Sequence, residues 1–384
     1  MSLPTVAVWR PLGSQWAKVG DVATYSELRF APTHLDIGSW SMTLPYDDAA
    51  LAIVKGRLLT FDWRGKRPLT GEILVRSEAT DPETGQLLLN VSGVGAASRL
   101  GWGQAWPDPT KGLNDPAQPV SGLYSGPAET VVLDIIRQNL RDRDGMAITV
   151  PASAGRGGDV KARTRYDNLL ELVTKKARRG GIGIRVGLVD TSGTRAQLKV
   201  SVYVPVDRSR RVELSQKIGT VREWNHTETA PTATRALVGG AGTGTTRVWR
   251  QVTTDASNAD AAAWGGHRTV FVDYPDSFDN TELDQAGEEA LDAGASTTSL
   301  ALTATEAEGL LAFQDYDVGD KATGELVTGV SVVDVITSIE VAVTATGVDV
   351  TPMFGDPDAH QPELAQAQLI RGLRREVKQL QTRR

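Results

Sequence analysis

The protein is a chain of 384 residues, of which 40% are hydrophobic and 23% are charged, with a formal net charge of −6 at pH 7. This length exceeds one ordinary domain and suits two to four domains. Because the chain contains no cysteine, its composition excludes a disulfide framework, a thiolate metal site and a cysteine nucleophile.

The charge is unevenly distributed along the chain. Residues 361–384 carry six basic and two acidic side chains, a charge of +4, which leaves −10 on the rest. An acidic body argues against nucleic-acid binding as the main role. No stretch approaches the roughly 20 apolar residues that cross a bilayer, and residues 1–13 lack the features of a signal peptide. We therefore expect a protein made in the cytoplasm and without membrane insertion.

The first hundred residues have the pattern of strands. Three extended runs, 58–63, 71–78 and 87–92, are joined by the sequences RGKRP and DPETG. Proline and glycine at these joints favour tight turns. Consecutive strands with short turns predict an antiparallel meander that forms part of a barrel or sandwich.

Residues 101–126 are rich in proline and glycine and predict a long surface loop or a domain boundary. Trp102 and Trp106 lie within this segment. Aromatic residues are enriched at interfaces, so both are possible partner contacts, although such side chains also fold back onto their own domain.

Two helices and a hairpin are predicted next. Residues 126–145 place Val132, Ile135, Ile136 and Leu140 on one stripe, and residues 165–181 repeat that spacing. Residues 181–204 then have the alternation of a hairpin with its turn at Ser192-Gly193. This α+β unit is expected to lie between β-rich segments.

The β pattern returns from residue 206, interrupted by a predicted helix over 281–294. In the last strands, alternate positions share one face, and Ala345 to Gly347 form the turn into the final strand. The positions on that face are Val335, Thr337, Ile339, Val341 and Val343.

The C-terminal segment 361–384 has the spacing of a short coiled-coil helix. Ile370, Leu373, Val377 and Leu380 follow intervals of three, four and three residues. A lone helix of this length is marginal in water, so its apolar seam must be buried. We expect it to mediate self-association, with packing on its own body as the alternative.

The glycine cluster Gly239, Gly240, Gly242 and Gly244 does not match a phosphate-binding loop. A Walker loop needs Gly-Lys-Ser/Thr, whereas Thr245, Thr246 and Arg247 follow here. A dinucleotide fingerprint opens a helix, but the sequence after the cluster is typical of a strand. The glycines therefore predict a bend between two strands.

No other pattern indicates catalysis. The four histidines have no ligand spacing, and no G-x-S-x-G elbow occurs. An acidic cluster fits turns and a helix start better than a glycosidase pair. Its members are Asp273, Asp276, Asp279, Glu282 and Asp284. We expect no enzyme activity, no catalytic or metal-binding residues and no cofactor.

Several passages, in this order and spacing, resemble the minor tail proteins of siphophages that infect actinobacteria. These passages are 128–140, 164–186, 206–249, 267–274 and 313–323. That family is distantly similar to the central baseplate hub of contractile-tailed phages. The resemblance covers most of the chain and is strongest over residues 128–355.

The resemblance implies a homotrimeric hub at the tail tip of the virion. The implied fold is α+β and β-rich, with two β-barrel-like, tail-tube-like domains that flank peripheral α+β domains. The expected division is 1–100 (hub domain), 101–126 (loop), 127–205 and 206–295 (peripheral), 296–355 (second hub domain) and 361–384 (oligomerising helix).

Such a hub adapts the sixfold tail tube to threefold tip proteins, and genomic DNA passes through its channel without specific binding. The implied partners are the distal tail protein, the tape measure protein and receptor-binding tip proteins. Two alternatives remain: a tail-associated cell-wall hydrolase, or a carbohydrate- or receptor-binding module that uses Trp102, Trp106 or Trp264.

Overall fold

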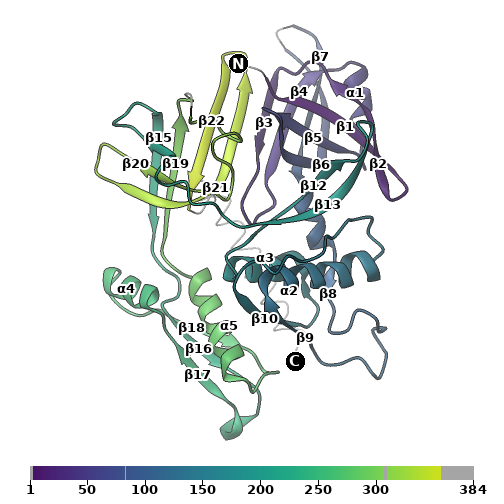
Figure 1. The fold of residues 1–384 in the computed structure, drawn as a ribbon. Helices are drawn as coiled ribbons and strands as arrows, with labels where there is room; N and C mark the ends of the chain where they lie inside the picture. The colour runs from purple at the N-terminus through teal and green to yellow at the C-terminus, as the bar shows by residue number, and fades with distance from the viewer. Residues whose placement is uncertain (1–2, 83, 307–308, 356–384) are drawn as a thin grey trace.

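The computed structural model describes residues 3–82, 84–306 and 309–355 (Figure 1). Strands dominate, and most of them join one large, almost entirely antiparallel sheet. No sheet in the described residues closes into a barrel. The predicted oligomerising helix, with Ile370, Leu373, Val377 and Leu380, lies outside the described residues.

The N-terminal unit is an antiparallel sheet in the order β2-β1-β5-β6-β7-β4-β3. The strands predicted over 58–63, 71–78 and 87–92 are confirmed as β5, β6 and β7. The elements are β1 (Thr5–Leu12), β2 (Gln15–Val22), β3 (Glu27–Ala31), β4 (Ser39–Pro45), α1 (Asp48–Ala52), β5 (Leu58–Trp63), β6 (Lys66–Thr80), β7 (Leu87–Gly95) and the 3₁₀-helix η1 (Ala96–Trp102).

Strand β1 is buried on both faces. Val6 and Val8 point into the main core, whereas Ala7 and Trp9 point into a second core under the helices. Burial on two sides explains why β1 is a continuous apolar run and not an alternating one. The strand thereby joins two layers of the protein.

The second unit packs on this far side of β1 and β2, where Ala7, Trp9 and Trp16 share a core with side chains of two helices and a hairpin. The predicted helices and hairpin are confirmed as α2, α3 and β12–β13, and β13 pairs with β2 through Arg195 and Ala196. The elements are β8 (Gln104–Ala105), β9 (Gly122–Pro127), α2 (Ala128–Ile136), the π-helical η2 (Arg137–Arg143), β10 (Asp159–Thr164), β11 (Asp167–Asn168), α3 (Leu169–Arg179), β12 (Gly183–Asp190) and β13 (Arg195–Tyr203).

The third unit has its own small sheet, in the order β17-β16-β18, and its own core. Helix α5 packs on one face of that sheet, against Ala236, Val238 and Val252. The elements are β16 (Arg235–Gly239), the 3₁₀-helix η3 (Gly244–Thr246), β17 (Trp249–Val252), α4 (Asp255–Ala263), β18 (Thr269–Asp273) and α5 (Asn280–Ala293).

The fourth unit continues the large sheet in the order β21-β22-β19-β15. Strand β15 pairs with β19 along its whole length, so it lies in this sheet although its residues belong to the range 206–295. The third unit is therefore inserted between β15 and β19. The elements are β14 (Glu213–Ser215), β15 (Val221–Thr229), β19 (Thr297–Ala304), β20 (Lys321–Glu325), β21 (Ser331–Thr344) and β22 (Gly347–Phe354).

The predicted buried face of β21 holds only in part. Ile339, Val341 and Val343 are buried as expected, but before them Ile336 takes the buried position in place of Val335. The register with β22 shifts between Ile336 and Ser338. A bulge adds one residue to the strand and moves the side chains before it to the opposite face.

The second and third units meet through basic and acidic side chains. Basic groups on β10 and α3 face acidic groups on α5 and on the loop before it. The pairs are Lys161–Asp279, Arg163–Glu282, Arg165–Asp276, Lys175–Glu289, Lys176–Glu289 and Arg179–Glu288. Lys176 and Glu289 are almost completely buried and lie 2.5 Å apart, so this pair is the centre of the contact.

Replacing Lys176 with methionine tests this contact. Lys176→Met leaves the buried Glu289 carboxylate with weaker compensation, and an uncompensated buried charge costs about 3 kcal/mol. We expect that loss in the free energy of unfolding measured with urea. Arg179→Met, which breaks the more exposed pair with Glu288, should cost less than about 1 kcal/mol. Equal losses for the two variants would contradict a central role for Lys176.

Candidate functional site

The main candidate surface is a run of strands that crosses from the first unit into the fourth. The order is β6-β7-β4-β3-β21-β22-β19-β15, with four strands from each unit. We call this run the spanning sheet. The two units lie side by side in Figure 1, and the strands continue from one into the other.

The junction of the spanning sheet is the pairing of β3 with β21. Leu28, Arg29 and Phe30 pair with Val343, Ala342 and Val341, respectively. Leu28, Phe30 and both valines point into the main core, which receives side chains from both units. The two units therefore share a sheet and a core, and neither buries its apolar surface alone.

The opposite face of the spanning sheet, its outer face, is rich in small hydroxyl and amide side chains. On β4 and β7, the Thr43 hydroxyl donates to Asn90 at 2.9 Å. Members of this face include Ser39, Ser41, Thr43, Asn90, Ser92, Thr303, Thr344 and Thr351. Side chains of this kind make the face mostly neutral and polar.

Charges on the outer face are few and weakly acidic. Arg29 pairs with Glu340 across the β3–β21 junction at 3.5 Å, and Arg222 pairs with Asp349. Glu27 also lies on this face, two residues before Arg29 on β3. The surface therefore holds no concentration of positive charge.

The spanning sheet has a free edge at each end. Strand β15 ends the sheet, and its Trp224 is 40% exposed. At the other end, β5 pairs with β6 only as far as Glu72, so the rest of β6 pairs with β7 alone. Leu74 and Val75 on this part of β6 are exposed. Unpaired strand edges are ready to bind a further strand.

A buried ion pair fixes the two halves of the spanning sheet. Arg64 lies in the turn between β5 and β6, and both its Nη atoms bond the Glu306 carboxylate of the fourth unit. Its Nη1 also donates to the carbonyl of Ala312 at 3.1 Å. Arg64 and Glu306 are 7% and 4% exposed. A bidentate pair restricts rotation between the units as well as separation.

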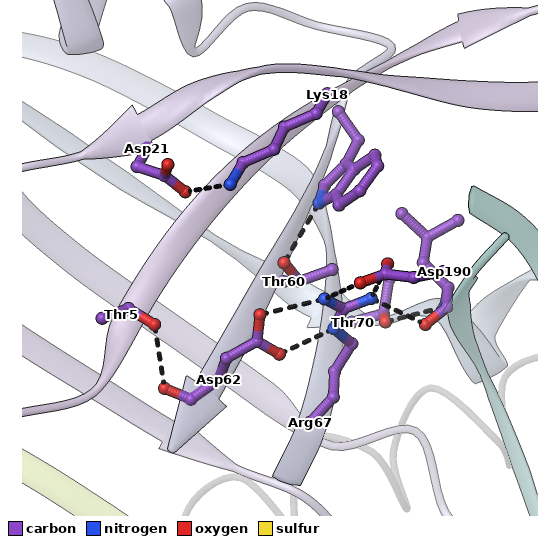
Figure 2. A network of polar contacts seen from close by, with 10 residues as sticks. Thr5, Lys18, Asp21, Thr60, Asp62, Arg67, Thr70 and Asp190 are labelled. Carbon is purple, nitrogen blue, oxygen red and sulfur yellow. Dashed lines mark hydrogen bonds and ion pairs between the residues drawn. The ribbon is translucent and has the colours of Figure 1, made fainter. Parts of the chain in front are cut away.

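A second polar network attaches the β12–β13 hairpin to the first unit (Figure 2). Arg67 on β6 binds Asp62 of β5 at 2.6 Å and Asp190 of β12 at 2.7 Å. Burial would lower the pKa of Arg67, but the hydrogen bonds to both carboxylates outweigh it and raise the pKa. Thr70 accepts from the Leu188 amide at 3.0 Å. Arg67, Thr70 and Leu188 line a cleft of about 290 Å³, and their polar groups are already paired within the chain.

Three units meet at His34. Its Nδ1 lies 2.7 Å from the Tyr203 hydroxyl of β13, and Arg185 of β12 reaches Asp317 of the fourth unit at 3.0 Å. Burial, followed by the charges of Arg178 and Arg185, lowers the pKa of His34 to about 4. Burial raises the pKa of Tyr203 to about 12. Both groups are therefore neutral at pH 7.

The two tryptophans of the 101–126 segment differ in their surroundings. Trp102 is 58% exposed at the end of η1. Trp106 is partly buried: the Arg143 guanidinium lies 3.3 Å from its ring centroid, and Tyr166 packs against it edge-on. The predicted partner contact stays a prediction. Of these two tryptophans, Trp102 is the one whose side chain is exposed.

The acidic cluster has a structural explanation. Asp273, Asp276, Glu282 and Asp284 each pair with an arginine. Asp279 caps α5 by accepting from the Thr281 amide at 2.8 Å, and its hydrogen bond with Lys161 lowers its pKa to about 2. A carboxylate held in its ionised form is a poor general acid.

The glycine-rich segment bends the chain between paired strands, as predicted. Strands β16 and β17 pair antiparallel on either side of it. Arg247 closes the bend by donating to the carbonyls of Gly239 and Gly240 at 2.9 and 3.0 Å. In the described residues, no group of three or more His, Asp or Glu side chains is placed to hold a metal ion. No helix there is long and apolar enough to cross a membrane.

The sequence matches the siphovirus ReqiPepy6 Gp37-like protein family over residues 5–356. The chain belongs to this family. The match spans all four units, from β1 to the end of β22, and confirms the siphophage relationship expected from the sequence. None of the curated proteins matches this chain.

Solved structures with a similar fold include three tail proteins. The 43 kDa tail protein of prophage MuSo2 from Shewanella oneidensis is 14% identical, with a TM-score of 0.56, over 92% of this chain and 99% of that protein. A tail protein from Neisseria meningitidis MC58 is 14% identical, with a TM-score of 0.55, over 93% and 98%. Prophage tail protein gp18 from Listeria monocytogenes EGD-e is 9% identical, with a TM-score of 0.52, over 96% and 100%. The family member described here therefore has a fold found in phage tail proteins.

His34 should make stability depend on pH. Because its pKa in the folded protein is about 4, below the ordinary 6.5, the unfolded chain takes up a proton that the folded protein refuses between these values. His34 therefore lowers stability as the pH falls from 7 to 4. We expect His34→Gln to reduce this loss by about 2 kcal/mol in urea unfolding, less than the full shift implies because the ring is partly exposed.

The exposed His267 supplies the matched control. His267→Gln removes an imidazole without changing the surroundings of His34, so it shows what the loss of a histidine does in general. If His34→Gln and the wild-type protein lose the same free energy of unfolding between pH 7 and pH 4, the neutral state assigned to His34 is wrong.

Proposed function

We propose that this chain is a structural, non-enzymatic protein of the siphophage tail tip and acts there as a homotrimeric hub. The observation that carries the proposal is the spanning sheet, in which two units of one chain each supply four strands to a common sheet. Family membership over residues 5–356 and the tail-protein fold support it. A chain with two such halves presents six similar elements when three copies form a ring.

The two free edges of the spanning sheet would allow three copies of the chain to form a ring. The β15 edge and the exposed half of β6 are different surfaces, so a contact between them is heterologous, and such contacts close into a ring when the rotation allows it. Each contact would pair unsatisfied backbone groups and bury Trp224, Leu74 and Val75. Three spanning sheets joined in this way form a continuous wall about a pore, with two barrel-like units per chain.

The outer face of the spanning sheet suits the wall of that pore. Its hydroxyl and amide groups are neutral, and Glu27, Glu340 and Asp349 outnumber its arginines. DNA is held mainly through its phosphates by lysine and arginine, so a neutral to weakly acidic wall lets DNA pass without binding. A cryo-EM map with arginines along the lumen would contradict this assignment.

The remaining parts of the chain take the periphery in this proposal. The third unit and the helices of the second unit lie below the spanning sheet in Figure 1. The distal tail protein, the tape measure protein and the tip proteins are the partners above and below the ring, in the virion. The helix predicted over 361–384 remains a prediction for trimer contacts.

Engineered cysteines test the ring contact directly, since the natural chain has no cysteine. One cysteine is placed on the free half of β6, at each position from 74 to 80 in turn, and one on β15, at each position from 222 to 229. We expect oxidation to give covalent dimers and trimers for a series of matched positions, because paired strands bring Cβ atoms within disulfide range. Denaturing gels and mass photometry measure the products.

The control pairs Val75→Cys with Val189→Cys. Val189 is as exposed as Trp224 but lies on β12, at the other end of the large sheet. That variant should give no trimer. A monomer at all concentrations, with no cross-linked series in purified protein or in assembled tails, would contradict the proposed hub.

A further inference from the structure

The third unit exposes aromatic rings on the face of its sheet that is turned away from α5. Trp249 of β17, Leu237 of β16 and Phe271 of β18 are 48%, 37% and 53% exposed. We call these three residues, with Arg247, Asp273 and Gln251 between and beside them, the aromatic platform. Helix α5 lies between this sheet and the second unit (Figure 1), so the platform faces outward.

Strand register gathers these side chains on one face. Leu237 pairs with Gln251 on one side and Phe271 on the other. In the next row, Gly239 pairs with Trp249 and Asp273. Residues directly opposite each other in a sheet point to the same face. The ring centroids of Trp249 and Phe271 are 6.0 Å apart.

Gly239 makes room for an arginine side chain on the platform, beside two rings whose planes are 44° apart. A Cβ atom at this position would come within 2.5 Å of the Arg247 guanidinium, so only glycine lets that group lie on the strand. The guanidinium carbon is 4.9 Å from the Trp249 ring centroid and 5.8 Å from that of Phe271. Backbone carbonyls of Gly239 and Gly240 fix it there. The result is a rigid surface of two rings and one planar cation.

The charge of the platform is balanced at its centre. Arg247 pairs with Asp273, so its positive charge is already compensated. The next cation on this face is Arg235, which starts β16, four residues from Gly239, or about 13 Å along the strand. A phosphate or another anion above the rings therefore finds no free positive charge. A ligand with neutral hydrogen-bonding groups, by contrast, could exchange hydrogen bonds with Gln251 and with the Arg247–Asp273 pair.

The platform is too small for a stable protein partner. Its strands of four and five residues, about 4.8 Å apart and rising about 3.3 Å per residue, cover an area of about 200 Å². A stable protein interface needs about 800 Å² from each partner. A protein that contacted the platform alone would therefore bind only weakly. An area of this size fits two or three sugar rings.

We propose that the aromatic platform binds an uncharged oligosaccharide. A pyranose ring has apolar C–H groups on its faces and hydroxyl groups at its rim. The rings of Trp249 and Phe271 would stack against the faces, and Gln251, Asp273 and Arg247 would exchange hydrogen bonds with the rim. The support for this proposal is the grouping of Trp249 and Phe271 on one sheet face beside polar side chains, since aromatic rings offer an apolar face for stacking.

The test uses the full-length protein on an array that carries neutral hexose and N-acetylhexosamine oligosaccharides next to sialylated and phosphorylated glycans. We expect binding to neutral glycans, and a Kd raised about tenfold in Trp249→Ala and in Phe271→Ala, since each ring contributes one stacking contact. Phe278→Ala is the matched control: Phe278 is 71% exposed in the same unit but lies in the loop before α5. It should bind as tightly as the wild-type protein.

Thermal unfolding of the variants separates binding from folding. The melting temperature should stay unchanged in all three variants, because the side chains are exposed. No binding to any neutral glycan, binding confined to charged glycans, or equal binding by wild type and Trp249→Ala would each overturn the proposal. These outcomes are independent of the ring contact, since cross-linking between β6 and β15 does not involve the third unit.

Discussion

The pairing of β3 with β21 sets the arrangement of the whole chain. It joins residues about 300 positions apart in sequence, so its closure costs chain entropy that local contacts do not repay. The shared core beneath it provides the compensation, because Leu28, Phe30, Val341 and Val343 are buried together. The β3–β21 ladder and the Arg64–Glu306 pair thus make the two halves one rigid body. A hub needs such rigidity, since a flexible joint would let its two edges drift out of register.

Open edges are the consequence of this design. A sheet that does not close leaves unpaired backbone groups, and natural proteins protect such edges with charged side chains. Here β15 carries Arg222, Glu223 and Glu228, and the free half of β6 carries Arg76 and Glu78. The charges disfavour pairing with unrelated strands, while the apolar residues beside them stabilise pairing with a complementary strand. Both features are expected of an edge that waits for a specific partner strand.

The sequence patterns predicted those elements that are stabilised by contacts between residues near each other in the sequence. The stripe of α3, the β12–β13 hairpin and the β21–β22 turn were all legible because a helix face or a tight turn needs only neighbouring residues. Helix α4 was missed, since its alanine-rich sequence has no apolar stripe. The place of β15 was missed because its partner, β19, follows some 70 residues later, after a complete inserted unit.

The structural role of the acidic cluster could be predicted from the sequence, but its basic partners could not. In three cases the basic partner is more than 100 residues away in the sequence. The aromatic platform was missed entirely, because Trp249 and Phe271 become neighbours only through strand register.

The position of the third unit would let it carry the proposed binding surface without disturbing the proposed hub. It is inserted between two adjacent strands, has its own core, and meets the second unit through ion pairs. Substitutions on the outward face of β16, β17 and β18 therefore leave the spanning sheet untouched. A tail tip that must keep its ring constant and change what it recognises requires this separation of the two tasks.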